Sequence, residues 1–386
     1  MKKLTLVAGA VLTLVSTTSA LAQSSVTLYG IVDAAVSYTT KQNATPGGPS
    51  VGSVTKIDAG QLATSRWGMR GSEDLGGGLK ATFNLESTIS NDTGAGGGAF
   101  GGNATTPVGS TTIVQSNGGT NPSLFDRAAT VGVAGGFGAL TLGRQNMLGV
   151  DAVAAVDPIG FSQPGINPNV SYSSLNNGAL FSSFGSNDGG AALRQNNSIR
   201  YALPAFSGFS GAAMYGFGEQ LGNSSANSYF GLVGSFSAGP ITASLGGSKL
   251  NNRTDSSKLT LAGGGLKYAI SDAFAVKATY TQSKVDTTSR KIGVAGVGVD
   301  FMAAPGLTLT AAYYNTKRSG DFDSKAQQLV GKVNYALSKR TSVYGLVTNE
   351  KVNSGTQPVA QRVGLIATAL GENSAARIAV GVFHSF

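Results

Sequence analysis

The residues that could perform covalent chemistry are few and widely separated. The chain of 386 residues has no cysteine and a single histidine, His384, which lies in an apolar row close to the C-terminus. A serine hydrolase needs its histidine beside a nucleophile and oriented by a carboxylate, and a zinc site of nitrogen and sulfur ligands needs more than one such residue. We therefore expect no catalytic residues, no cofactor and no metal centre, and a protein that is not an enzyme.

Other catalytic motifs are equally weak. Residues 96–101 match the pattern G-x-G-x-x-G, but no buried strand precedes them and Asn-Ala-Thr-Thr-Pro follows instead of a helix, so the match does not indicate a dinucleotide site. Aspartate and glutamate are dispersed, and the sequence leaves open whether distant loops bring two carboxylates together. A calcium site made of loop carboxylates is also left open, without a spaced motif to support it.

Basic side chains follow a more regular pattern. Arg66 and Arg70 alternate with apolar neighbours, and the same alternation recurs around Lys80, Arg200, Lys277, Lys332 and Arg377. Alternation with a period of two places the two sets of side chains on opposite faces of a strand. Acids with the same parity are few, chiefly Asp33 and Glu86. The chemistry that this pattern can supply is electrostatic: strands with positive charge along their polar face.

Strands must carry these residues, because alternation dominates the whole chain. In residues 79–87, Leu, Ala, Phe and Leu alternate with Lys, Thr, Asn and Glu. Similar segments predict sixteen strands, an even number as in bacterial membrane barrels. The predicted strands lie near 25–38, 61–72, 78–90, 124–134, 138–146, 195–203, 208–218, 227–237, 240–250, 258–270, 273–284, 291–303, 307–317, 326–336, 341–350 and 375–386.

The connections between these strands alternate in length. Short ones include 135–138, 238–240 and 304–306, and the long polar ones are 39–60, 91–123, 147–194 and 351–374. Short turns at one rim and long loops at the other are typical of an up-and-down outer-membrane barrel. The pattern predicts an all-β fold, a 16-stranded antiparallel transmembrane β-barrel with short periplasmic turns and long extracellular loops.

Composition and the N-terminus agree with export to a membrane. Charged residues make up 12% of the chain and the mean hydropathy is +0.06, whereas soluble proteins carry about 25% charged residues. Two lysines, an apolar run over 4–15 and Ala20-Leu21-Ala22 are typical of a cleaved signal peptide. That run of about 12 residues is too short for a membrane helix of roughly 20. We expect a signal peptide over 1–22 and one barrel domain over 23–386.

The basic character of the chain does not indicate nucleic-acid binding. The formal charge of +9 falls to about +7 when Lys2 and Lys3 leave with the signal peptide. The remaining lysines and arginines are spread singly, without the basic cluster interleaved with aromatic residues that such proteins carry. We expect no nucleic-acid partner.

Several segments resemble the general porins of β-proteobacteria, of the neisserial and Burkholderia type. They are SVTLYGIVD (25–33), SRWGMRGSEDLGGGLKATFNLE (65–86), RAATVGVAGGFGALTLGRQ (127–145), NSIRYALPAFSGF (197–209), YALSKRTSVY (335–344) and GVFHSF (381–386). The resemblance spans the whole mature chain. It implies a 16-stranded barrel in the outer membrane of a Gram-negative bacterium, a homotrimer, and a third loop folded into the pore. Outer-membrane lipids and lipopolysaccharide would surround such a barrel.

Two long connections carry further expectations. The third, 147–194, fits the pore-inserted loop by size and position and carries Asp151, Asp157 and Asp188; which part of it lines the constriction is left open. Residues 91–123 are rich in glycine. The resemblance implies that they reach over a neighbouring subunit, whereas their composition is equally typical of a flexible extracellular loop.

Together these observations predict an outer-membrane diffusion pore for small hydrophilic solutes and ions. Fixed charge in a narrow pore biases which ions enter, so a basic wall predicts a preference for anions. Arg144 shares parity with apolar neighbours, so either a bulge re-aims it or it lies near a rim. The predicted pore-lining and constriction residues are Arg66, Arg70, Lys80, Arg144, Asp151, Asp157, Arg200 and Lys277.

Two alternatives keep the same scaffold. A substrate-specific channel would need a row of aromatic residues or a dedicated ligand site, and Tyr29 and Tyr314 have lumen parity without forming such a row. An outer-membrane enzyme or adhesin is the more distant alternative. Uptake graded by solute size would distinguish a general pore from both.

Overall fold

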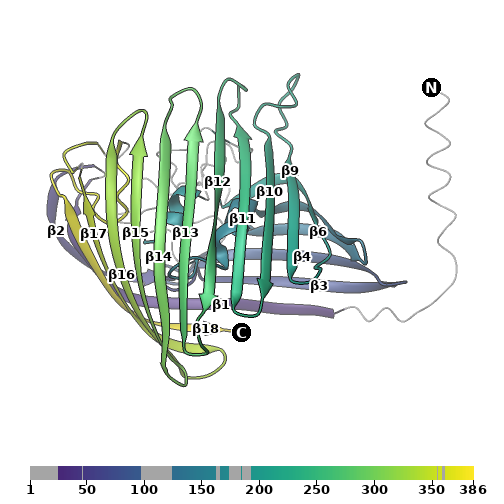
Figure 1. Ribbon diagram of the computed structural model, residues 1–386, viewed down its shortest axis with the longest axis horizontal. Helices are drawn as coiled ribbons and strands as arrows, with labels where there is room; N and C mark the ends of the chain where they lie inside the picture. The colour runs from purple at the N-terminus through teal and green to yellow at the C-terminus, as the bar shows by residue number, and fades with distance from the viewer. Residues whose placement is uncertain are drawn as a thin grey trace.

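The computed structural model describes residues 25–45, 47–96, 124–161, 166–173, 184, 193–353, 355–358 and 361–386. Antiparallel strands follow one another around a closed barrel, and the pairing of β1 with β18 closes it (Figure 1). The predicted signal peptide and most of residues 91–123 lie outside the described residues.

The strands have the following bounds. They are β1 (Ser25–Asn43), β2 (Ser50–Ala59), β3 (Arg66–Gly76), β4 (Leu79–Ser90), β5 (Ala95–Gly96), β6 (Ala128–Gly135), β7 (Gly138–Asn146), β8 (Arg194–Ala202), β9 (Phe209–Gly216), β10 (Tyr229–Ala238), β11 (Ile241–Asn251), β12 (Lys258–Ala269), β13 (Phe274–Val285), β14 (Lys291–Ala304), β15 (Leu307–Ser319), β16 (Ser324–Ala336), β17 (Thr341–Val352) and β18 (Ser374–Ser385).

These segments occupy sixteen positions around the barrel, which confirms the predicted fold. The start of β1 pairs with β3 and its later part pairs with β2, so β2 and β3 share one position. β5 is a two-residue ladder on β4. The prediction of a long loop over 39–60 is wrong, because β1 continues to Asn43 and β2 begins at Ser50. Gly52 and Ser53 interrupt the apolar alternation there, which hid the strand.

The two rims differ as the spacing predicts. Short turns join the strands at one rim, and at Gly239 and Gly306 the backbone adopts φ of 53° and 80°, a conformation that glycine enters without steric cost. The start of β1 and the C-terminus lie at this same rim (Figure 1). The longer connections lie at the opposite rim, here called the loop rim.

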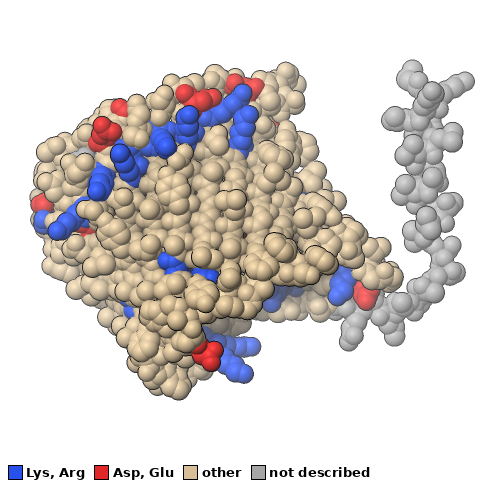
Figure 2. Space-filling view, viewed as in Figure 1, with Lys and Arg blue, Asp and Glu red and all other residues tan. Residues whose placement is uncertain are grey.

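The outer face of the barrel is apolar. Outward side chains such as Leu245 and Val380 are 71% and 64% exposed, and exposed apolar surface on this scale indicates contact with lipid. Charged side chains follow the loop rim, and the face below them is mostly uncharged (Figure 2). No helix in the described part of the chain is long and apolar enough to cross a membrane.

The third long connection folds into the barrel, which confirms the prediction of an inserted loop. Its helix α2 (Leu148–Ala154) and the short π-helix η1 (Asn169–Ser173) lie inside the ring of strands (Figure 1). Leu148, Ile159 and Ile166 of this loop form a buried cluster with inward side chains of the strands from β9 to β17. The interior is therefore partly filled on the side of the later strands.

Candidate pore constriction

Hydrogen bonds fasten the inserted loop to one side of the wall. The Leu148 amide donates to the Tyr229 hydroxyl on β10 at 3.0 Å, and the Ser244 hydroxyl on β11 donates to the Ala152 carbonyl. Further along the loop, the Gln328 amide on β16 donates to the Ile166 carbonyl at 2.5 Å. The loop is thus held from β10 to β16 by side chains that point into the barrel.

Asp157 is the central anchor of this loop. Its carboxylate accepts hydrogen bonds from the Tyr314 hydroxyl at 3.0 Å and from the amides of Asn167 and Asn169 at 2.9 and 2.8 Å. The side chain is 1% exposed, and this burial raises the pKa of the Asp157 carboxyl although the hydrogen bonds oppose the rise. The structure thus places this predicted constriction residue in the anchor of the loop.

Lys277 lies on the same side. Its ammonium group forms an ion pair with Asp300 at 2.6 Å and is 3.5 Å from the Pro158 carbonyl of the loop. The neighbouring Lys332 donates to the Ile159 carbonyl at 2.8 Å. Both lysines have the predicted inward orientation, and both contact the back of the inserted loop.

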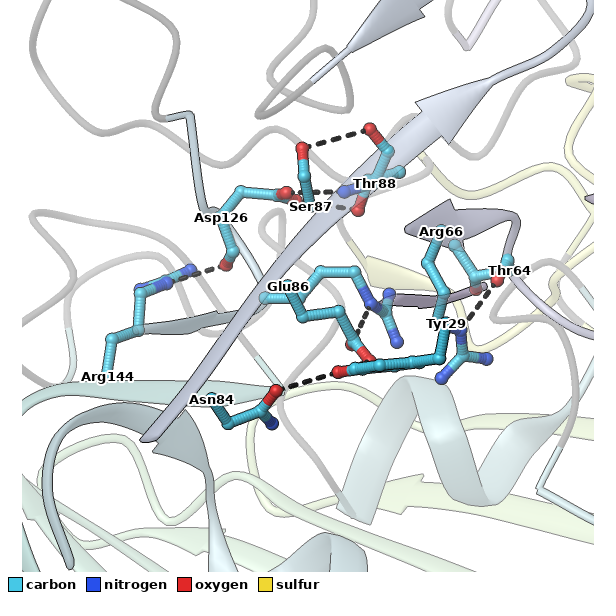
Figure 3. A network of polar contacts seen from close by, with 10 residues as sticks. Tyr29, Thr64, Arg66, Asn84, Glu86, Ser87, Thr88, Asp126 and Arg144 are labelled. Carbon is cyan, nitrogen blue, oxygen red and sulfur yellow. Dashed lines mark hydrogen bonds and ion pairs between the residues drawn. The ribbon is translucent and has the colours of Figure 1, made fainter. Parts of the chain in front are cut away.

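A different set of charges lines the opposite side, on the earlier strands (Figure 3). Glu86 on β4 forms an ion pair with Arg127, which precedes β6, at 2.5 Å. The Tyr29 hydroxyl on β1 donates to Glu86 at 3.0 Å and to Asn84 at 2.8 Å. These contacts fix the only acid of β4 against one arginine and one phenol.

Arg66 and Arg70 lie beside this pair on β3. The Arg66 Nε donates to the Thr64 carbonyl at 3.0 Å, and its charge is close enough to interact with Arg127 and Glu86. The Arg70 guanidinium lies over the Tyr29 ring, 5.2 Å from its centre, at a distance where a cation is attracted to an aromatic face. The predicted pair is therefore brought together around Tyr29.

A bulge brings Arg144 to the same surface. The pairing of β7 with β8 shifts register between Gly143 and Gln145, and Gly143 adopts φ of 120°. A bulge of this kind re-aims the side chain that follows it. Arg144 thereby donates to the Asp126 carbonyl at 2.6 Å and to Asn196. The Asp126 carboxylate accepts from the amide and hydroxyl of Thr88.

Arg194, at the start of β8, completes this basic wall. It is buried and close enough to Arg127, Arg144, Glu86 and Asp126 for their charges to interact. Among the described residues, this basic wall therefore holds five arginines and two carboxylates: Arg66, Arg70, Arg127, Arg144 and Arg194, with Glu86 and Asp126.

One ion pair links the basic wall side to the inserted loop. Arg200 on β8 contacts Asp151 of α2 at 2.8 Å, and both side chains are partly exposed, at 27% and 29%. Burial raises the pKa of the Asp151 carboxyl, and the Arg200 charge opposes the rise. Lys80 lies elsewhere, exposed near the turn from β3 to β4 at the short-turn rim.

Arg127 and Arg194 were not among the predicted site residues. Arg127 precedes the first residue of β6, so the alternation within that strand did not predict which way its side chain points. Arg194 could have been found, since counting back in twos from Arg200 arrives at it. The predicted strand began one residue too late, and Asn197, with φ of 50°, interrupts the regular strand.

A second loop also folds inward. The Glu350 carboxylate on β17 accepts hydrogen bonds from the backbone amides of Leu365, Ile366 and Ala367 at 2.8 to 2.9 Å. The Arg362 guanidinium donates to carbonyls of the same loop, including that of Ala369 at 3.1 Å. Residues 361–370 of the last long connection therefore fold into the barrel, and the mostly apolar run from Val363 to Leu370 was a signal of this that the prediction of a polar loop overlooked.

A closed barrel with an apolar outer band, inward-folded loops and a charged inner wall is a membrane channel. The described residues contain no group of three or more His, Cys, Asp or Glu that could hold a metal ion.

Comparisons with known proteins identify the family. A family model described as Gram-negative porin matches residues 8–355. Outer membrane porin protein 32 of Delftia acidovorans is 32% identical over 95% of this chain and 96% of its own. Major outer membrane protein P.IB of Neisseria gonorrhoeae is 28% identical over 55% of this chain and 48% of its own. The chain belongs to the Gram-negative porin family.

Solved structures agree. An anion-selective porin from Comamonas acidovorans has a TM-score of 0.72 at 27% identity, covering 94% of this chain and 100% of its own. The trimer form of OmpT from Vibrio cholerae, at a TM-score of 0.60 and 15% identity over 94% and 99%, shares the fold. The protein is thus an outer-membrane porin, a channel for passive diffusion of small hydrophilic solutes, as the sequence predicted.

Proposed function

We propose that this pore prefers anions and that the basic wall causes the preference. The observation that carries the proposal is the excess of arginine over carboxylate within the basic wall, five arginines against Glu86 and Asp126, with Glu86 already paired to Arg127. Fixed charge facing a narrow aqueous path raises the local concentration of counter-ions. The similar structure from Comamonas acidovorans is described as an anion-selective porin, which supports the same conclusion.

The geometry supports a simple passage mechanism. Solutes enter through the loop rim, pass between the basic wall and the inserted loop, and leave at the short-turn rim without energy input. Arg66 and Arg70 face the path from one side and Asp151 from the other. The field between opposite charges orients dipolar solutes. Apolar solutes pass less readily, because they displace the water that solvates these charged groups and cannot replace its hydrogen bonds.

The test is the reversal potential of single channels in planar bilayers under a salt gradient. Changing Arg66→Gln and Arg70→Gln together removes two positive charges from the wall, so the ratio of anion to cation permeability should fall severalfold. A matched variant, Lys339→Gln with Arg340→Gln, removes two charges from a turn at the short-turn rim. This variant should change the ratio of anion to cation permeability little. A cation-preferring native channel would overturn the proposal.

Solute range needs a separate measurement. We propose a general pore, since the described wall shows charges and no continuous aromatic row. Liposome swelling with sugars and amino acids of increasing size should show uptake that declines gradually with size. Steep discrimination between solutes of equal size would indicate a substrate-specific channel instead.

We further propose that the mature chain begins at Gln23 and assembles as a homotrimer. The small-residue pattern before Gln23 supports cleavage, and the OmpT structure described as a trimer form has the same fold. N-terminal sequencing of the protein from outer membranes should begin at Gln23. Native mass spectrometry should give three times the mature mass, and a monomer would contradict the assembly.

A further inference from the structure

Three glycines on the inner face of the barrel lie directly behind the inserted loop. They are Gly246 on β11, Gly265 on β12 and Gly298 on β14. Gly265 pairs with Ser244, whose hydroxyl binds the loop, so the backbone at this level faces the loop as well. Other inward positions of the same strands carry larger residues, such as the buried Leu261. The three glycines are here called the glycine seat.

The loop approaches the glycine seat so closely that a larger residue would not fit. An added Cβ atom at Gly298 would lie 2.8 Å from the Cβ atom of Pro158. At Gly246 it would lie 2.8 Å from the Cβ atom of Ala152. Carbon atoms in contact are separated by about 3.5–4.0 Å. An alanine at either position would therefore overlap the loop.

Tight packing continues behind helix α2. Ala152 and Val153 line a cavity of about 10 Å³ between the helix and the strands β11 and β12, which is at the lower limit for holding one water molecule. An added Cβ atom at Gly265 would lie 2.9 Å from a methyl group of Val156, and it would also overlap the Ala278 carbonyl of β13. The loop therefore has no room to move closer to the wall.

The strands are the more rigid side of this contact. Each of β11 to β14 is hydrogen-bonded to a neighbouring strand on both edges. The loop is held here by single side chains: the Ser244 hydroxyl donates to the Ala152 carbonyl. The Lys277 ammonium, on the residue directly opposite Gly298, donates to the Pro158 carbonyl at 3.5 Å. A group added to the glycine seat would therefore displace the loop rather than the strands.

The other side of this part of the loop faces the lumen. Ala155 is exposed and Asp151 and Ala154 are partly exposed, whereas Ala152 and Pro158, which contact the glycine seat, are buried. Relief of a 2.8 Å contact to an ordinary carbon–carbon distance requires a shift of about 1 Å. Such a shift would move Ala155 away from the glycine seat and into the lumen.

We propose that the glycine seat sets the size limit of the pore. The absence of side chains at Gly246 and Gly298 lets the inserted loop lie close against the strands and leaves more of the lumen open. These glycines are then specificity-determining residues for passage, although neither touches a solute. The inference rests on the proposed passage of solutes between the basic wall and the inserted loop. It concerns the size of that passage, whereas the basic wall concerns its charge.

The experiment measures single-channel conductance in planar bilayers and the swelling of liposomes in sugars of increasing size. Gly298→Ala should lower the conductance, and uptake of the largest permeant sugars should slow severalfold while uptake of the smallest changes little. Gly246→Ala should act in the same direction. The matched control is Gly345→Ala on β17, where an added Cβ atom meets nothing within 4 Å, and this variant should conduct like the native channel.

A methyl swap separates displacement of the loop from strain between strands. The variant Gly246→Ala with Ala152→Gly transfers one methyl group from the loop to the wall. It removes the contact with the loop and keeps the contact of 3.0 Å with the Leu232 carbonyl of β10, so its conductance should return toward the native value. Native conductance in both Gly298→Ala and Gly246→Ala, in barrels intact by circular dichroism, would overturn the proposal. A swap variant that conducts no better than Gly246→Ala alone would also overturn it.

Selectivity distinguishes this proposal from the one on the basic wall. The anion preference of Gly298→Ala should not fall, because every charge of the basic wall remains. A cation-preferring native channel whose conductance still falls in Gly298→Ala would overturn the anion proposal alone. An anion-preferring channel whose conductance is unchanged in Gly298→Ala and Gly246→Ala would overturn the proposal on the glycine seat alone.

Discussion

At the scale of single residues, each charge is defined by what it contacts. Lys277 points inward as Arg66 does, yet it contacts the inserted loop, whereas Arg66 faces the lumen beside Glu86. Asp157 belongs to that loop and is bound by Tyr314 of the wall. Alternation in the sequence identified Arg66, Arg70 and Glu86, because β3 and β4 are regular there. It could not identify which inward charges a loop would later cover, since that depends on contacts between distant segments.

We expect Asp151 to make the selectivity of the pore depend on pH. Burial raises the pKa of its carboxyl, so as pH falls below neutral Asp151 takes up a proton earlier than an ordinary aspartate does. The arginines of the basic wall stay charged, because a guanidinium does not titrate in this range. The lumen therefore becomes more positive, and anion permeability relative to cations should rise as pH falls from neutral toward the ordinary aspartate pKa of about 4.

Reversal potentials measured over that pH range test this directly. The Asp151→Asn variant should already show the higher anion preference at pH 7, and its dependence on pH should be flatter. A native channel whose selectivity stays constant down to about pH 4, the ordinary range of an aspartate, would contradict this prediction.

At the scale of elements, the polar contacts that hold the inserted loop come from single side chains on separate strands. Tyr314 on β15 makes two of its contacts, donating to Asp157 at 3.0 Å and accepting from the Ile159 amide at 3.3 Å. The length and position of segment 147–194 predicted that it would enter the barrel. Its attachment points were not predictable, because they are isolated polar residues on strands that are distant in sequence.

Removing one hydroxyl should therefore loosen the loop. The Tyr314→Phe variant loses both hydrogen bonds and leaves the buried Asp157 with one donor fewer, at a cost of about 1–3 kcal/mol to the loop. Single-channel recordings should show more frequent current fluctuations, with the barrel intact by circular dichroism. Tyr313→Phe, which changes the outward neighbour on the same strand, is the matched control. Its current fluctuations should be as infrequent as those of the native channel.

At the scale of the whole molecule, the residue types on the outer surface of the barrel follow from the lipid that they contact. The sixteen-position barrel was predictable because every second residue must suit lipid and the others water. The number of separate strands could not be predicted, because the alternation of apolar and polar residues fails at Gly52. The position next to β1 in the barrel is divided between β2 and β3.

A charge placed on the lipid face should therefore cost more in the middle than at the rim. Leu245→Arg, in the middle of β11, should destabilise the folded barrel by about 2–4 kcal/mol, whereas Asn349→Arg, outward and close to the loop rim, should cost about 0–1 kcal/mol. Urea unfolding in lipid vesicles, followed by tryptophan fluorescence of Trp67, gives both values. Equal losses at the two positions would mean that Leu245 does not face the bilayer core.

Because the inserted loop is attached to one side of the barrel, different parts of the chain form the basic wall and hold the loop. The segment from β1 to β8 supplies the arginines of the basic wall, which we propose act on passing ions. Strands β10 to β16 supply the hydroxyls, amides and lysines that bind the inserted loop. Apart from the contact between Arg200 and Asp151, the residues of the basic wall and the residues that bind the inserted loop lie in separate halves of the polypeptide. Charge could therefore be redesigned in the first half while pore width is tuned independently in the second.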